Sequence, residues 1–176
     1  MAFDIRAASD DVDAVYLNHQ DRAAKIVDAV TRRKGLPDEW LNQAAKQFAP
    51  PRGNPAPHLL QFRDYPRNGS ALGLRIFTPT PEYLLAMKIL ANRAEDDGKN
   101  LTDARDAVAL MKLTGIDTYE KIVDLMSQCY PNIPGIVLPT ISARMRAKIK
   151  SLVDEYNAAN RTHPTWNAGR GRPLPP

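Results

Sequence analysis

The stretch SDDVDAVYL, residues 9–17, decides which fold the chain is expected to form. Asp11 and Asp13 alternate with apolar residues, which is the period of two typical of a β-strand with one polar face. The alternative is a helix that Ser9 caps, with the acids in its first turn. The polar segment NHQD at 18–21 interrupts the apolar run and favours a strand over one continuous helix.

On a strand, Asp11 and Asp13 would project from the same face, about 6.6 Å apart along the chain. Two carboxylates placed in this way can share one Mg²⁺ or bridge a pair of ions, an arrangement used in phosphoryl and nucleotidyl transfer. The neighbouring Asp10 would point away from them. A short acidic pattern of this kind is common, so the spacing alone does not separate a metal site from a capped helix.

The rest of the chain predicts an α+β fold with about three strands, in a small mixed sheet packed by helices, and a helical C-terminal half. Asn68-Gly69 stands between two apolar runs, 58–65 and 72–77, and predicts a β-hairpin. Helical spacing or capping predicts six helices, over 21–35, 37–48 (anchored by Trp40), 78–94, 101–113, 117–130 and 140–160. We therefore expect an α/β core over 1–80, a helical part of the same unit over 81–160 and a disordered tail over 161–176.

Composition and net charge limit the classes of protein to which the chain could belong. The chain has 176 residues, of which 43% are hydrophobic, and a net charge of +4. No apolar run reaches the roughly 18 residues needed to span a bilayer, and the single Cys129 fits a reducing cytoplasm. We expect a cytoplasmic protein without a membrane partner. The mild basicity permits a nucleic-acid partner, and four basic residues of the last helix are candidates for RNA contacts: Arg144, Arg146, Lys148 and Lys150.

Three motifs carry a resemblance to a known family: DVDAVY at 11–16, GLPDEWLN at 35–42 and EYLLAMK at 82–88. In this order and spacing, residues 6–155 resemble a bacterial family with a nucleotidyltransferase fold. Its members are related to the AbiEii-type toxins of toxin–antitoxin and abortive-infection systems. The resemblance implies a nucleotidyltransferase-like core in this chain.

The resemblance also implies roles for single residues. Asp11 and Asp13 match the strand carboxylates that hold Mg²⁺, Lys88 matches a helical lysine that contacts the nucleotide phosphates, and Asp103 matches the second acid of a conserved helical segment. The first acid of that segment is Asn100 here, which departs from the family. From the residues alone, Lys88 could instead extend its amine to the surface, and Asp103 could be a capping acid.

Two further features qualify the resemblance. Transferases of this type often use a third carboxylate on a neighbouring strand, for which Asp64 is the candidate here, although it could equally be a turn residue. They also carry a Gly-Gly or Gly-Ser pair on a helix before the acidic strand, and residues 1–9 lack it. Either that helix is encoded upstream of Met1, or the chain has lost it; without it we expect weak nucleotide binding.

The preferred prediction is Mg²⁺-dependent transfer of a nucleoside monophosphate from an NTP to an RNA or protein hydroxyl, in a toxin–antitoxin or phage-defence system. The alternatives are a catalytically inactive binding or regulatory protein with the same fold, and an RNA-binding module that uses the last helix. The predicted partners are the NTP, its acceptor, and an antitoxin or a second copy of the chain. A partner or a second copy would cover apolar surface left bare by the missing helix.

Overall fold

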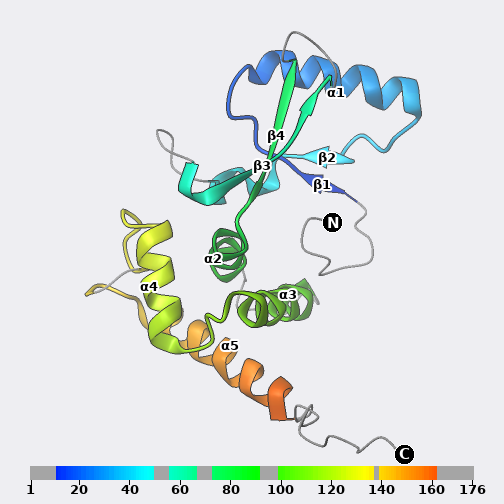
Figure 1. Ribbon diagram of the computed structural model, residues 1–176. Coiled ribbons are helices and arrows are strands. Elements are labelled where there is room, and N and C mark those ends of the chain that lie inside the picture. Colours follow the sequence, from blue (N-terminus) through cyan, green and yellow to red (C-terminus); the bar gives the residue numbers. More distant parts are fainter. Residues whose placement is uncertain (1–10, 50–55, 67–72, 92–98, 137–138, 162–176) are drawn as a thin grey trace, which may run out of the picture. The chain divides into compact units, whose positions relative to one another are not determined.

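The computed structural model describes residues 11–49, 56–66, 73–91, 99–136 and 139–161 (Figure 1). It confirms the α+β class, with five α-helices, two 3₁₀ helices and two two-stranded sheets in these ranges. The chain forms two compact units, Met1–Arg93 and Ala94–Pro176. The boundary differs from the division at residue 80 that the sequence suggested, because helix α2 (Pro81–Ala91) belongs to the N-terminal unit. Asp10, the Asn68-Gly69 turn and the tail lie outside the described residues.

The described part of the N-terminal unit opens with a strand, a helix and a second, parallel strand. These are β1 (Val12–Asp13), α1 (Gln20–Lys34) and β2 (Leu41–Asn42). The strand expected around Asp11 and Asp13 is present as β1, but its regular pairing with β2 covers only two residues. Gly35 ends α1 as predicted, since its φ of 62° is in the left-handed region where glycine carries no steric penalty, and its N–H donates to the Thr31 carbonyl.

The helix predicted over 37–48 does not form. The chain instead turns over residues 38–40, pairs with β1 as β2, and then forms the 3₁₀ helix η1 (Ala44–Phe48). Two observations give the reason. The backbone N–H of Val12 donates to the Trp40 carbonyl at 2.8 Å, which draws this segment into the sheet. The Asn42 side chain accepts from the Ala44 N–H at 2.8 Å, and such a local side-chain bond competes with helical pairing.

Trp40 has a different role from the expected helix anchor. Its indole N–H donates to Thr31 Oγ1 on α1 at 2.8 Å, and the Thr31 hydroxyl donates in turn to the Val27 carbonyl at 3.0 Å. The half-buried tryptophan therefore links the segment before β2 to the last turns of α1.

The predicted hairpin is present as β3 (Leu59–Tyr65) and β4 (Leu74–Pro79), preceded by the 3₁₀ helix η2 (Ala56–His58). Helix α2 follows directly, and Thr80 caps it by accepting from the Tyr83 N–H at 3.2 Å. Tyr83 is fully buried, stacks on His58 with ring centroids 4.6 Å apart, and donates its hydroxyl to the Phe48 carbonyl at 3.0 Å. These contacts join α2 to the hairpin base and to η1.

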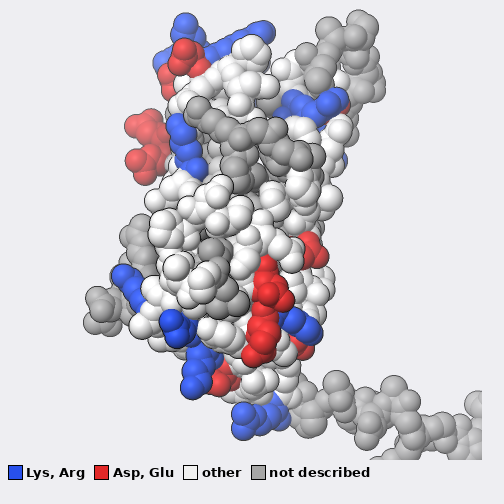
Figure 2. All heavy atoms as spheres, turned by 90° about the vertical axis from the view of Figure 1, so that its left-hand side faces the viewer, with Lys and Arg blue, Asp and Glu red and all other residues white. Residues whose placement is uncertain are grey.

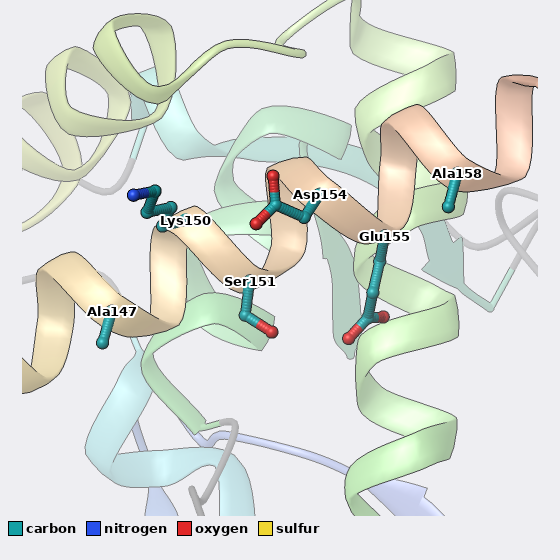
Figure 3. Close-up of a pocket in the computed structure, with 6 residues that line it drawn as sticks. All are labelled: Ala147, Lys150, Ser151, Asp154, Glu155 and Ala158. Carbon is teal, nitrogen blue, oxygen red and sulfur yellow. The ribbon is translucent and has the colours of Figure 1, made fainter.

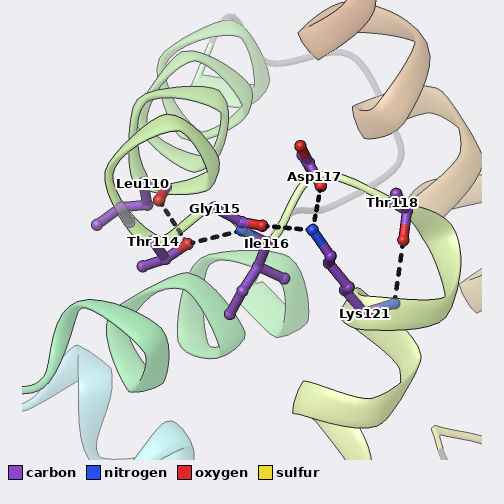
Figure 4. A network of polar contacts seen from close by, with 7 residues as sticks. All are labelled: Leu110, Thr114, Gly115, Ile116, Asp117, Thr118 and Lys121. Atoms are coloured by element: carbon purple, nitrogen blue, oxygen red, sulfur yellow. Dashed lines mark hydrogen bonds and ion pairs between the residues drawn. The ribbon is translucent and has the colours of Figure 1, made fainter.

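Three helices lie in the described part of the C-terminal unit: α3 (Lys99–Thr114), α4 (Tyr119–Cys129) and α5 (Ala143–Arg161). Each contributes apolar side chains that are less than one-tenth exposed, among them Leu110 and Met111, Ile122 and Met126, and Ile149 and Leu152. Of the two capping candidates before α4, Asp117 and Thr118, it is Thr118 that caps the helix, by accepting from the Lys121 N–H at 3.3 Å. The Lys121 amine bonds to both the Gly115 carbonyl and Asp117, which fixes the turn between α3 and α4 (Figure 4).

Burial is distributed unevenly between the units. Among the described residues of the N-terminal unit, the buried apolar side chains are those of Tyr83, Leu85, Ala86 and Ile89, all on α2. Side chains of β1, β2, β3, β4 and α1 are half-buried or exposed. The candidate functional residues near the N-terminus thus lie on the more open of the two units.

Candidate functional site

The candidate site is built on the short parallel pair β1 and β2, which lie side by side in Figure 1. Val12 and Ala14 donate their N–H groups to the carbonyls of Trp40 and Asn42, both at 2.8 Å. Regular strand geometry covers Val12 and Asp13, and Asp11 stands at a bend directly before the strand, so strand alternation alone does not place the Asp11 side chain. Both aspartates are exposed.

Asn42 joins this pair from the neighbouring strand. The register pairs it with Asp13, so the two side chains share a face, and its amide Nδ2 donates to Asp11 Oδ2 at 2.9 Å. Its Oδ1 accepts from the Ala44 N–H, and this second bond sets which end of the amide faces Asp11. Through this bond the Asp11 carboxylate lies beside Asn42, whose side chain shares a face with that of Asp13.

The donor set suits a hard cation. Carboxylate oxygens are ligands that Mg²⁺ accepts, and Mg²⁺ commonly takes one or two carboxylates while water and phosphate oxygens complete its shell. The amide bond to Asp11 is of the kind that orients ligating carboxylates in metal sites. The described residues contain no group of three or more His, Cys, Asp or Glu side chains arranged to hold a metal. A cation at this site would be bound by two protein carboxylates, those of Asp11 and Asp13.

Asp64, the candidate third carboxylate, is engaged elsewhere. It lies on β3, and both of its oxygens accept from Arg75 on β4, at 2.9 Å each. The hydrogen bond from Arg75 is the main cause that lowers the pKa of Asp64 below its ordinary value of 3.8. The register pairs these two residues across the hairpin, so the ion pair is a cross-strand contact of that sheet.

Lys88 and Asp103 lie in different units. Lys88 is half-buried on α2, in the unit that carries the two aspartates. Asp103 is half-buried on α3 in the C-terminal unit. Because α3 begins at Lys99, Asp103 is the fifth residue of the helix, beyond the position of a capping acid.

The four basic residues of the last helix do not form a single stripe. Successive helix positions are about 100° apart, so residues two apart in sequence lie on nearly opposite sides of the helix. Arg144 and Lys148 therefore occupy one side of α5 and Arg146 and Lys150 another. The Arg146 guanidinium donates to the Ile141 carbonyl at 2.9 and 3.1 Å, and burial is the main cause that lowers the pKa of Lys148. In the face drawn in Figure 2, basic and acidic side chains are interspersed among the described residues.

A hollow of about 510 Å³ lies along one side of α5. It is lined by Ala147, Lys150, Ser151, Asp154, Glu155 and Ala158, which occupy successive turns of this helix (Figure 3). Its charged side chains are of both signs and spaced as ordinary helix surface pairs. The lining indicates no particular ligand chemistry.

Asn42 is the residue that sequence reasoning missed. It belongs to the GLPDEWLN motif, for which a helix was predicted, so Asn42 was not expected on a strand beside Asp13. The usable signal was the asparagine itself, because its side chain readily bonds to the backbone two residues on and so disfavours a continuing helix.

No helix among the described residues has the length and apolar character that crossing a membrane requires. The comparisons with protein-family models, curated proteins and solved structures gave no match to this chain.

Proposed function

We propose that the chain binds a divalent cation together with a nucleoside triphosphate on the β1–β2 face, and that it transfers the nucleoside monophosphate to a hydroxyl group of RNA or protein. The observation that carries the proposal is the position of Asn42, which pairs with Asp13 in the register of β1 and β2 and donates to Asp11 Oδ2. The sequence resemblance assigns the same two carboxylates to this chemistry.

Each residue has a defined task in this proposal. Asp11 and Asp13 bind the cation, and the bound cation would neutralise the negative charge that develops on the triphosphate. Lys88 offsets further triphosphate charge. The acceptor oxygen forms a bond to the α-phosphorus as the bond to pyrophosphate breaks, and the acceptor proton passes to solvent. An antitoxin as partner follows from the resemblance to toxins alone.

The experiment measures cation binding first and turnover second. Mn²⁺ or Mg²⁺ is titrated into the purified chain by calorimetry, with and without each NTP, and pyrophosphate release is then followed with RNA and with protein acceptors. We expect cation binding that is weakened strongly by Asp11→Asn and by Asp13→Asn. Asp28→Asn is the matched control, because Asp28 is an exposed aspartate of the same unit on α1. Cation binding unchanged in both site variants would refute the site.

A second candidate is a non-catalytic binding protein with the same fold, and one observation favours it. Asp64, the candidate for a third carboxylate, lies on the β3–β4 sheet and not on the β1–β2 sheet, and both of its oxygens accept from Arg75. This candidate predicts cation and nucleotide binding that depends on Asp11 and Asp13, without pyrophosphate release. Release that disappears in Asp13→Asn would exclude it.

A further inference from the structure

Helix α1 is rich in exposed basic residues. It contains five lysines and arginines against two aspartates, and all of these side chains are exposed. The basic residues of the last turn are explained by the helix dipole, which favours cations at that end. The dipole does not explain Arg22, which lies in the first turn, where a cation is unfavourable.

Four of the five basic residues share one side of α1. They are called the α1 stripe below: Arg22, Lys25, Arg32 and Arg33. At about 100° per residue they fall within an arc of about 100° around the helix axis, and at 1.5 Å per residue they extend over about 16 Å of it. Lys34 lies about 100° beyond Arg33, outside the arc. The two aspartates, Asp21 and Asp28, lie together beyond the opposite border, so no acid interrupts the stripe.

The other side of α1 faces its own unit. Thr31 lies there and accepts from the Trp40 indole N–H at 2.8 Å, and the half-buried Val27 and Val30 share that side. The stripe is therefore directed away from the segment that leads into β2. In the described part of the chain, no ion pair engages any of its four cations. The four charges can therefore meet an anion from outside.

The length and composition of the stripe fit a polyanion with regularly spaced charges. A nucleic-acid duplex carries a phosphate about every 3.4 Å of its axis on each strand, so about 16 Å of helix can lie beside several phosphates. Three of the four cations are arginines, whose planar guanidinium groups pair with phosphate through two parallel hydrogen bonds. A helix that lies on a lipid surface needs a broad apolar face beside its charges. The large apolar side chain that α1 exposes is that of Ile26 alone.

The same angular criterion distinguishes α1 from α5, the helix for which RNA contacts were predicted. The basic residues of α5 fall on two nearly opposite sides of that helix, and Arg146 is bonded to the Ile141 carbonyl. A single phosphate backbone could meet only part of them. The four cations of the α1 stripe could contact one backbone together.

We propose that the α1 stripe binds the backbone phosphates of RNA without sequence preference. Besides its cations the arc contains Ala29, and it has no amide or aromatic side chain that could contact a base. RNA is named rather than DNA because the proposed transfer uses RNA as an acceptor, and in this respect the inference rests on the proposed function. The binding itself needs neither NTP nor a cation at Asp11 and Asp13.

The test measures binding of a fluorescent RNA duplex of about 16 base pairs by anisotropy, without Mg²⁺ or NTP, from about 50 to about 200 mM salt. Four phosphate contacts predict a slope of about 3 to 4 for log Kd against log salt. Arg33→Gln should lower this slope by about 1 and weaken binding about fivefold to tenfold near 0.1 M salt. Lys34→Gln is the matched control, because it removes an exposed cation of the same turn outside the arc. We expect it to change Kd less than about twofold.

A second variant guards against a local folding defect. Arg22→Gln removes a stripe cation at the other end of α1, where its loss does not oppose the helix dipole, and circular dichroism checks the helical content of each variant. Weaker RNA binding in both stripe variants, with native helical content and an unaffected Lys34→Gln, supports the proposal. An equal loss in all three variants overturns it, because net charge would then explain the binding.

The choice of partner is tested with the same assay. RNA binding at least as tight as that of a DNA duplex of the same sequence supports the proposal. Absence of RNA binding, tighter binding of the DNA, or displacement of the RNA by polyglutamate of equal total charge overturns it, the last because an acidic protein segment would then fit the stripe equally well. Because no cation or NTP is present, a failure here is distinct from a failure of the proposed function, which the cation and pyrophosphate measurements report.

Discussion

Replacing Asn42 by alanine tests the geometry of the candidate cation site. The substitution removes the amide that donates to Asp11 Oδ2 at 2.9 Å, and leaves both aspartates in place. It also removes the acceptor for the Ala44 N–H. We expect Asp11 to lose its fixed orientation and cation binding to weaken.

The expected magnitude follows from the exposure of the site. Loss of a partner that orients a ligating group costs 10- to 100-fold in affinity in built metal sites. Here Asp11 is exposed, so water replaces much of the lost hydrogen bond, and the net worth of such a bond is about 1 kcal/mol. We therefore expect the dissociation constant for Mn²⁺ to rise about fivefold to tenfold.

The assay is calorimetric titration of Mn²⁺ into the wild-type chain, Asn42→Ala and Asn42→Asp. Asn42→Asp is the informative companion, because it keeps an acceptor for the Ala44 N–H and places a third carboxylate beside Asp13, with which residue 42 pairs. We expect it to bind Mn²⁺ more tightly than the wild-type chain. Equal affinity in all three proteins would refute the geometric reasoning, and absence of binding in all three would refute the site itself.

Three further predictions concern other parts of the structure. The pKa of Asp64 in the folded chain, measured by carboxyl carbon NMR, should lie below 3.8 and should rise in Arg75→Met. The ion pair stabilises the fold above pH 3.8, and this stabilisation is lost as the pH falls through the pKa of Asp64 in the folded chain. Burial lowers the pKa of His58 in the folded chain below 6.5. As the pH falls, the unfolded chain therefore binds the proton at a higher pH than the folded chain, and the melting temperature should decrease below pH 6.5. This decrease should be smaller in His58→Gln. Ile149→Ala should lower the free energy of unfolding by about 2–5 kcal/mol in urea titrations, whereas Leu113→Ala should change it little.

Helices were the part of the fold best predicted from the sequence, because their signals are local. The bounds of α1 and α4 follow from an apolar stripe and from caps at Gly35 and Thr118, all within one segment. The helix prediction over 37–48 was wrong for the opposite reason. Its residues have helical spacing, but pairing with β1 about 30 residues away and one asparagine bond overrode that preference.

The site was predicted only in part. The alternation of Asp11 and Asp13 with apolar residues did indicate a strand, and β1 confirms it. The contact between Asp11 and Asn42 spans 31 positions and depends on the register of two short strands, which no local pattern specifies. The bulge between Gln61 and Arg63 changes which residues of β3 share a face, and this too is decided by pairing with β4 rather than by local alternation.

The uneven burial of the two units bears on how the candidate site would work. Strands β1 and β2 pair over two residues each, and their side chains are half-buried or exposed, so little apolar burial opposes local opening there. The helices of the C-terminal unit carry fully buried side chains such as Met111, Ile122 and Ile149. A cation held by Asp11 and Asp13 would then add stability where the fold itself supplies least, since a ligand that binds only the ordered state stabilises that state. The proposed cation site thus lies where the described strands bury little apolar surface.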